Sequence, residues 1–183
     1  PRNSRFDYQK FWQHSLGVAI TAKVAGKDLG YPEPEELFVG GLLHDIGKLI
    51  HNQYLTDSFN KLLDFAREKK LYVHEAEEKV YSLNHADTGA MLVERWKLPP
   101  VLREMVGYHH NPSRLMPRSR HVAFVHIADS LAAAQGLGSG GVDLVPPIER
   151  DVWESIGIDD SRLDFILETS RKEYQQLVPL LTI

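Results

Sequence analysis

Apolar residues recur along this chain at the three- and four-residue spacing of an α-helix, and the two-residue alternation typical of strands is nearly absent. The first such run places Phe11, His14, Val18 and Ala22 on one face and predicts a helix over residues 7–29. Because helical periodicity continues almost to the C-terminus, the sequence predicts an all-α fold.

Prolines and capping side chains mark the boundaries of the later helices. Pro34 is followed by two glutamates, a combination favoured in the first helical turn by the fixed φ angle and by the helix dipole. Asn84 is a good N-cap, and Pro99 and Pro100 separate two helices. The later helices are predicted over residues 34–50, 57–69, 73–81, 85–96, 100–108 and 118–135, with a last helix that begins near Asp160 or Ser161.

A segment rich in glycine and proline follows the predicted helix 118–135. Its composition is typical of a flexible connection, and we expect a mobile loop at about 136–147. The chain has 183 residues, of which 43% are apolar, which is enough to bury one full core. We therefore expect a single helical domain over residues 1–183.

Composition narrows the possible functions. The chain has no cysteine, which excludes disulfides and thiolate metal ligands, so any bound metal must have nitrogen and oxygen ligands. No apolar run approaches the roughly 20 residues that span a membrane, and no signal-like segment opens the chain. The formal charge of -4 argues against a nucleic-acid partner. We expect a cytoplasmic protein without membrane association.

The pair His44-Asp45 interrupts an apolar run that begins at Phe38. Burying an imidazole and a carboxylate is costly unless a metal or a cation takes up their lone pairs. On the predicted helix 34–50 the pair would lie in mid-helix. We interpret it as part of a metal site, with core packing and satisfied hydrogen bonds as the alternative.

Further histidines and one aspartate extend this pair into an ordered series. A single histidine on an apolar helix face is more often a hydrogen-bonded core residue than a metal ligand. Convergence of several such residues on one centre is better explained by a metal. The candidate metal ligands are His14, His44, Asp45, His85, His109, His110 and Asp129. The histidines assigned instead to the surface or to core packing are His51, His74, His121 and His126.

This series, with Lys48 completing an HDxGK signature, resembles the HD superfamily of metal-dependent phosphohydrolases. Over about residues 11–177 the chain is more narrowly similar to the HDOD branch, which consists of bacterial signalling and regulatory domains. The resemblance implies an HD-domain-like helical bundle with metal ligands that converge from several helices. The segments that carry the resemblance are FWQHS (11–15), GLLHDIGK (41–48), NHADTGA (84–90), WKLP (96–99) and YHHNP (108–112). Many HDOD proteins lack an intact metal site and an established activity, whereas this chain keeps every superfamily ligand.

The resemblance implies one or two divalent metal ions, with Asp45 as the bridging ligand of a pair. The other ligands would be His14, His44 and Asp129 for one ion and His85, His109 and His110 for the other. Imidazole-rich sites with some oxygen donors suit iron, manganese, nickel or zinc better than magnesium.

Three departures from related sequences change these expectations. Phosphodiesterases of the HD-GYP branch, which cleave cyclic di-GMP, carry a Glu and a Gly-Tyr-Pro loop after the His doublet, whereas Asn111 and Pro112 follow it here. The Glu that recruits a third metal in some of them is Lys10 in this chain, so no trinuclear centre is expected. Full HDOD domains have a helical lobe before the first ligand helix, but only ten residues precede Phe11, so we expect a fragment or a truncated variant.

Asp45 and Lys48 are the expected catalytic residues. Lys48 follows Asp45 by one helical turn and is placed to neutralise a phosphate oxygen, although a lysine near a helix end is also favoured by the dipole alone. Arg114 and Arg118 are expected to bind substrate phosphate together with Lys48, with solvated loop charges as the alternative.

Three function classes remain open from the sequence. We favour a signalling domain with metal-dependent phosphohydrolase or phosphodiesterase chemistry on a phosphate-containing small molecule. The alternatives are a non-catalytic module that binds a signalling protein and a nucleotide sensor, each with a structural metal.

Overall fold

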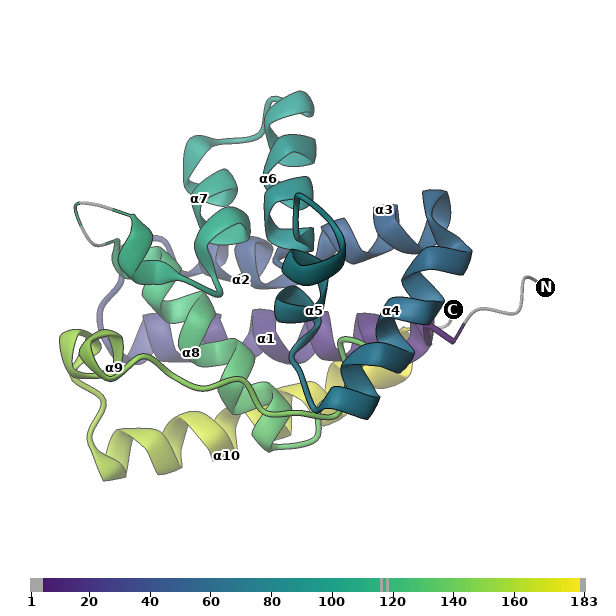
Figure 1. The fold of residues 1–183 in the computed structure, drawn as a ribbon. Coiled ribbons are helices and arrows are strands. Elements are labelled where there is room, and N and C mark those ends of the chain that lie inside the picture. Colours follow the sequence, from purple (N-terminus) through teal and green to yellow (C-terminus); the bar gives the residue numbers. More distant parts are fainter. Residues whose placement is uncertain (1–4, 116, 118, 182–183) are drawn as a thin grey trace.

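The computed structural model describes residues 5–115, 117 and 119–181. As the sequence predicts, every regular element in these residues is a helix (Figure 1). The helices are α1 Tyr8–Asp28, α2 Pro34–Leu43, α3 Ile46–Tyr54, α4 Thr56–Lys69, α5 Val73–Val80, α6 His85–Arg95, α7 Pro100–Tyr108, α8 Arg120–Ala134, α9 Arg150–Ile156 and α10 Asp160–Leu177, with short 3-10 turns at Pro112–Arg114 and Val178–Leu180.

Most helices begin within one residue of the predicted position. The Asn84 side chain accepts a hydrogen bond from the Asp87 amide, and the Asp87 carboxylate accepts one from the Asn84 amide, which confirms the predicted N-cap of α6. The predicted start of α8, Arg118, lies outside the described residues.

The predicted helix 34–50 is wrong at its centre. α2 ends at Leu43 and α3 begins at Ile46, so His44 and Asp45 lie at a break between two helices and not in mid-helix. The backbone of Asp45 leaves the helical region, with φ -99° and ψ 7°. A close backbone contact lies on each side of the break. Gly41 is held against Ala19 of α1, and Gly47 is held against His85 of α6.

Helix α9 was not predicted. It has seven residues, of which only Val152 and Ile156 are buried, so its apolar pattern is too short for a period to be read.

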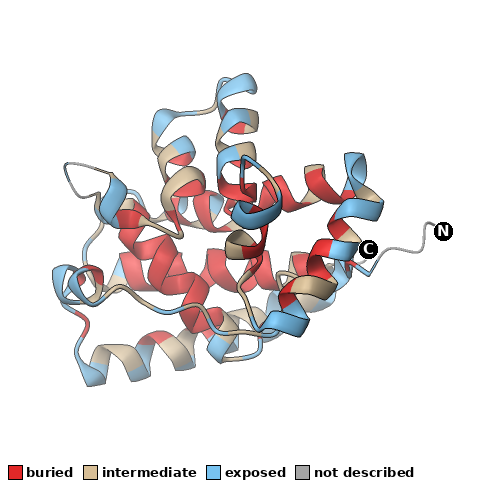
Figure 2. Ribbon diagram, in the orientation of Figure 1, coloured by how far each residue is buried: buried red, intermediate tan, exposed pale blue. Residues whose placement is uncertain are grey.

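Helix α1 lies at the centre of the fold and packs against α2, α8 and α10 (Figure 1). It is buried on nearly all sides, and the red colour of Figure 2 follows it and α8 through the interior. Along α1, Phe11 belongs to a small hydrophobic cluster formed with α4 and α5, whereas Val18 belongs to the large cluster formed with α2, α7 and α8. His14 lies between these two residues, so the first candidate ligand is placed where the two clusters meet.

Replacing Gly47 by alanine is expected to destabilise the fold strongly. A Cβ atom on Gly47 would overlap the carbonyl oxygen of His85 and approach the Gly89 amide to 2.9 Å, and backbone does not move aside as a side chain does. Overpacking of this kind costs about 1–3 kcal/mol or more. Thermal unfolding of Gly47→Ala measures the loss, with Gly107→Ala as the control because its new Cβ meets only the Ala90 side chain at 3.2 Å. Equal melting temperatures for the two variants would contradict the expectation.

No helix in the described part of the chain is both long and apolar enough to cross a membrane.

Candidate metal centre

Helices that are far apart in the sequence bring all seven candidate ligands to one place. They come from α1, from the break between α2 and α3, from the first turn of α6, from the end of α7 and from α8. Their ligand atoms form two groups, each with all atoms within 4.8 Å of one another: His14, His44 and Asp129 in the first group, and Asp45, His85, His109 and His110 in the second group.

The first group is formed around Asp129. Its Oδ1 atom lies 3.0 Å from His14 Nε2 and 3.9 Å from His44 Nε2. His44 Nε2 also lies 3.4 Å from Asp45 Oδ2, so the first group borders on the carboxylate of the second.

The second group is formed around the other oxygen of Asp45. Asp45 Oδ1 lies 3.0 Å from His85 Nε2 and 3.7 Å from His109 Nε2, and His85 Nε2 lies 2.8 Å from His110 Nε2. The two oxygens of Asp45 therefore face different groups, which is the placement that a carboxylate shared by two cations requires.

The protonation of the rings suits metal binding. His44 Nδ1 lies 2.7 Å from the carbonyl oxygen of Gly41, and His109 Nδ1 lies 2.7 Å from that of Val106. Because a carbonyl only accepts, each ring must carry its proton on Nδ1, which leaves the Nε2 lone pair pointing into the centre. His44 Nε2, His109 Nε2 and Asp45 Oδ1 are buried without a hydrogen-bond partner. Such atoms are costly unless a cation takes up their lone pairs, so the residues fit a metal.

The pKa values of the residues in the centre depend on burial and on the charges of their neighbours. Burial opposes ionisation of Asp45, yet His44 and Lys48 hold its pKa well below the usual range. Burial lowers the pKa of His44, but Asp45 beside it outweighs burial and raises the net value. Burial lowers the pKa of His109 to about 4, so this ring is neutral and ready to bind a metal at neutral pH.

Glu77, which no sequence pattern had selected, is fully buried behind His85. Its Oε2 atom accepts hydrogen bonds from the Nδ1–H of His85 at 2.6 Å and from the His85 amide at 2.9 Å. Its Oε1 atom accepts from Nδ1 of His51 at 2.9 Å. Glu75, Glu77 and Glu78 look alike on the predicted helix, and only the docking of α5 on α6 distinguishes the middle one.

Two further histidines, which the sequence assigned to the surface or to packing, lie beside the ligands. The His74 ring stacks on the His110 ring with centroids 4.0 Å apart, and burial lowers the pKa of His74 to about 3. His126 donates from Nδ1 to the carbonyl oxygen of His109 at 2.7 Å, and its Nε2 atom accepts from the Glu149 amide. Both therefore help to position the His doublet, and the HD motif alone contains no signal for either.

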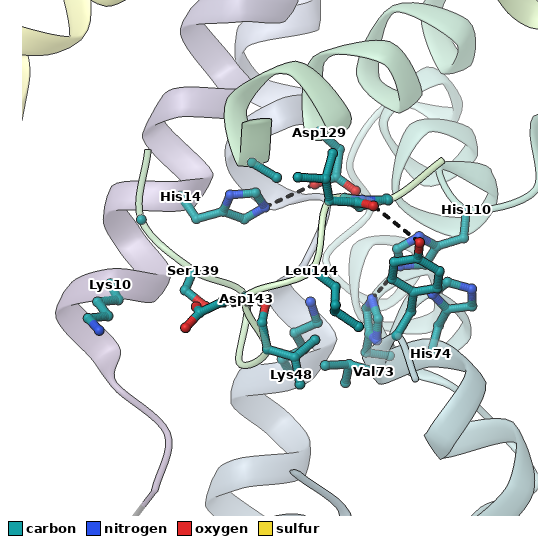
Figure 3. Close-up of a pocket in the computed structure, with 18 of the residues that line it drawn as sticks. Lys10, His14, Lys48, Val73, His74, His110, Asp129, Ser139, Asp143 and Leu144 are labelled. Carbon is teal, nitrogen blue, oxygen red and sulfur yellow. Dashed lines mark hydrogen bonds and ion pairs between the residues drawn. The ribbon is translucent and has the colours of Figure 1, made fainter. Parts of the chain in front are cut away.

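A cavity of about 380 Å³ opens onto both groups of ligands. Figure 3 shows His14 and Asp129 on one side of it and His74 and His110 on another, with Lys48 between them. Lys48 is buried, and its Nζ atom lies 2.6 Å from Asp45 Oδ2. The predicted proximity of Lys48 to Asp45 is thus present despite the break between the helices.

The segment 136–146 forms one wall of this cavity. Ser139 donates its amide to the Lys10 carbonyl at 3.0 Å, Arg67 donates to the Gly141 carbonyl at 2.9 Å, and Tyr72 donates its hydroxyl to the Val145 carbonyl at 3.2 Å. The segment is thus attached to α1, to α4 and to the residue before α5, and its mobility stays a prediction.

Gly140, in this wall, lies beside Lys48 and Asp45. A Cβ atom placed on it would lie 2.7 Å from Lys48 Nζ and 3.0 Å from Asp45 Oδ2. A side chain at this position would occupy the space beside Lys48 and Asp45, so glycine at position 140 keeps that space open.

Among the described residues, no arginine lines this cavity. Arg114 lines a separate cavity between α6 and α7, which shares only His110 with the first. Arg118 lies outside the described residues. Lys48 is therefore the one expected phosphate-binding residue that the described structure places beside the metal ligands.

Metal binding is expected to release protons from His44 and His85. The pKa values of His44 and His85 are raised because Asp45 and Glu77 outweigh the effect of burial, so both rings keep a second proton to higher pH than usual in the metal-free protein. A metal binds only the neutral ring, so affinity rises with pH until the raised pKa values are passed, by about tenfold per pH unit for each proton displaced. Calorimetric titration in buffers of different ionisation enthalpy measures this release. A heat of binding that is independent of the buffer would contradict it.

The model of the HDOD domain family matches residues 1–112, which contain all the candidate ligands except Asp129. The chain belongs to the HDOD domain family. Among curated proteins, an uncharacterized protein of Treponema pallidum (strain Nichols) is 28% identical over 94 residues, which are 49% of this chain. Ribonuclease Y of a Nitratiruptor species is 33% identical over 122 residues, which are 67% of this chain. The matched part is only 18% of the length of each of these relatives.

Solved structures share the fold over almost the whole chain. An HDOD domain protein from Geobacter sulfurreducens is 28% identical, with a TM-score of 0.82 over 96% of this chain and 63% of its own. A proposed phosphohydrolase from Shewanella amazonensis is 26% identical, with a TM-score of 0.73 over 97% of this chain and 64% of its own. The chain thus spans slightly less than two thirds of the length of either structure.

Proposed function

We propose that this HDOD domain is a metal-dependent phosphohydrolase or phosphodiesterase that serves a signalling role. The observation that carries the proposal is the position of Asp45, whose two oxygens face two separate groups of histidines. Both groups reach the cavity, the first through His14 and the second through His85 and His110. Structural similarity to a protein named as a proposed phosphohydrolase supports the same chemistry.

The two groups described above would hold two divalent ions, and Asp45 would be shared between them. Iron, manganese, nickel and zinc suit these nitrogen and oxygen donors. When bound, such a pair supplies a hydroxide at neutral pH and polarises the phosphoryl group.

The protein's own residues supply positioning and charge. Asp45 is ionised at neutral pH because its pKa is strongly lowered, so it does not need to lose a proton before it binds a cation. Lys48 holds an ammonium group beside the same carboxylate and can contact a phosphate oxygen when the negative charge of Asp45 is shared with cations. Gly140 leaves room for the substrate above both residues.

The cavity favours a small phosphate-containing molecule as the substrate. Its volume of about 380 Å³ is within the range of small-ligand pockets. Tyr72, Val73, Leu144, Val145 and Pro146 give part of the wall an apolar character, which suits an ester with an organic group better than inorganic phosphate. One relative carries the name ribonuclease Y, but the net charge of -4 favours a small substrate over RNA here.

A second candidate function is a non-catalytic module or a nucleotide sensor with a structural metal, bound to a signalling protein partner. The observation that favours it is the segment 136–146, which forms one wall of the cavity and is attached to the helical domain at three points.

Metal analysis followed by a substrate screen tests the proposal. The protein, purified without chelator and reconstituted with each candidate metal, is assayed on cyclic mononucleotides, cyclic dinucleotides, nucleotides and bis(4-nitrophenyl) phosphate. We expect up to two metal equivalents and hydrolysis that a chelator abolishes. Metal below about a tenth of an equivalent after reconstitution would contradict the site. A loaded protein that is inactive on every substrate, yet melts at a much lower temperature after chelation, would support the structural alternative.

A further inference from the structure

Glu77 is placed to act on the metal centre through His85. It is an acceptor-only carboxylate when ionised, and three N–H groups from His51 and His85 surround it. Hydrogen bonds from N–H groups favour the ionised form of a carboxyl group, and Glu77 is fully buried among these three donors. Glu77 is therefore placed as a buried carboxylate acceptor behind His85.

The hydrogen bond from His85 determines which nitrogen of that ring can bind a metal. Since Glu77 Oε2 only accepts, His85 must carry a proton on Nδ1, and its Nε2 atom then faces Asp45 and His110 as a potential ligand. The separation of 2.6 Å is typical of a strong, charge-assisted bond. The partial negative charge passed to the ring makes Nε2 a stronger metal donor.

His51 lies at the far side of the same carboxylate and holds it in place. Its Nδ1 atom bonds Glu77 Oε1, and its Nε2 atom lies 2.9 Å from the Thr88 hydroxyl on α6. His51 is on α3, Glu77 is on α5 and His85 is on α6. The chain of contacts therefore links three helices behind the second group of ligands.

The first group has no such support within the described residues. His44 donates to the carbonyl of Gly41, which is uncharged, and His14 Nδ1 is buried without a hydrogen-bond partner. Both groups contain histidine ligands, but only in the second group does a histidine ligand donate its Nδ1–H to a buried carboxylate that is not itself a ligand.

We propose that Glu77, held by His51, is a positioning residue that sets the affinity of the second metal site, formed by Asp45, His85, His109 and His110. The proposal rests on the metal centre of the proposed function, but it requires no catalysis. Loss of the carboxylate charge is expected to weaken the second site by about 10–100-fold, as is typical for partners behind metal ligands, and to leave the first site nearly unchanged.

The test compares Glu77→Gln with Glu78→Gln. Both substitutions remove one negative charge from α5, but Glu78 is exposed and bonds Asn84, which is not a ligand. Competition with a chelating indicator measures the two zinc affinities of each variant. We expect Glu77→Gln to lose at least tenfold at one site and less than threefold at the other, and Glu78→Gln to match the parent. Equal losses at both sites, or no loss, would overturn the proposal.

A second measurement needs no metal. In the metal-free parent, the short bond between His85 and Glu77 should give a strongly downfield imidazole N–H proton in the NMR spectrum, shielded from exchange by burial. We expect this signal to move upfield in Glu77→Gln and to persist in Glu78→Gln. An unchanged signal in Glu77→Gln would show that the carboxylate does not hold the ring.

His51→Asn provides a milder variant in case Glu77→Gln does not fold. It removes the ring that holds Glu77 Oε1 but keeps the carboxylate, so we expect a smaller loss of affinity at the same site. A loss at the other site instead would overturn the proposal.

A parent protein that binds two zinc ions in this Glu77-dependent way but hydrolyses no phosphoester would refute the proposed function alone. A hydrolase with unchanged zinc affinities in both variants would refute this inference alone.

Discussion

Asp45→Ala is expected to lose more metal than any other single substitution in the chain. Asp45 Oδ1 faces His85 and His109, and Asp45 Oδ2 faces His44, so one carboxylate serves both groups. A ligand shared by two ions affects both when it is removed. After reconstitution, elemental analysis should find less than about a tenth of the parent's metal.

Two further variants make this result specific. Asp129→Ala removes a carboxylate from the first group only and should lose about half of the metal. Asp57→Ala removes an exposed carboxylate in the first turn of α4 and should lose none. If Asp45→Ala retains the metal content of the parent, Asp45 does not bridge two ions. Equal losses in Asp45→Ala and Asp129→Ala would indicate one metal in place of two.

The sequence was sufficient for most of the helices, though not for α9 or for the break between α2 and α3, and it named the residues that the structure brings together. Helical periodicity and caps such as Asn84 depend on neighbouring residues, and outside the predicted helix 34–50 the structure agrees with the predicted bounds to within about two residues. The break at His44 and Asp45 could not be predicted in this way. The close contacts on either side of it, of Gly41 with α1 and of Gly47 with α6, are tertiary and cannot be read from neighbouring residues.

The residues behind the ligands were not predictable for a similar reason. Glu77 and His51 are 26 positions apart in the sequence, and their contact exists only after α3, α5 and α6 have packed. A motif identifies the atoms that face the metal, because their types and order are restricted by the chemistry. It does not identify the partners that orient them, since any helix that packs nearby can supply a carboxylate or a carbonyl.

The wall formed by segment 136–146 was predicted as a loop, but its place in the site was not. Its composition indicated only flexibility. In the structure, Leu137 is part of the large hydrophobic cluster and Val142 packs against the small one, so the segment crosses the region where the ligands lie. Gly140 then comes to lie beside Lys48 because of where these two anchors are.

Lys48→Ala separates the enzyme from the structural alternative. If Lys48 contacts a phosphate oxygen in the transition state, its removal should lower turnover by about 10² or more. Metal content should stay at the parent's level, because Lys48 is a cation beside Asp45 and not a ligand. In a non-catalytic module with a structural metal, Lys48→Ala would leave the melting temperature and the affinity for the partner protein close to those of the parent.

The measurement is steady-state hydrolysis of whichever phosphoester the parent cleaves, with metal content determined on the same samples. Lys27→Ala, which removes an exposed lysine at the end of α1, is the control and should be indistinguishable from the parent. A fall in turnover that accompanies a fall in metal content would show that Lys48 acts on the stability of the centre. Full turnover in Lys48→Ala with normal metal content would exclude its contact with the transition state. Because Lys48 Nζ already lies 2.6 Å from Asp45 Oδ2, the decisive outcome is low turnover in a sample that is fully loaded with metal.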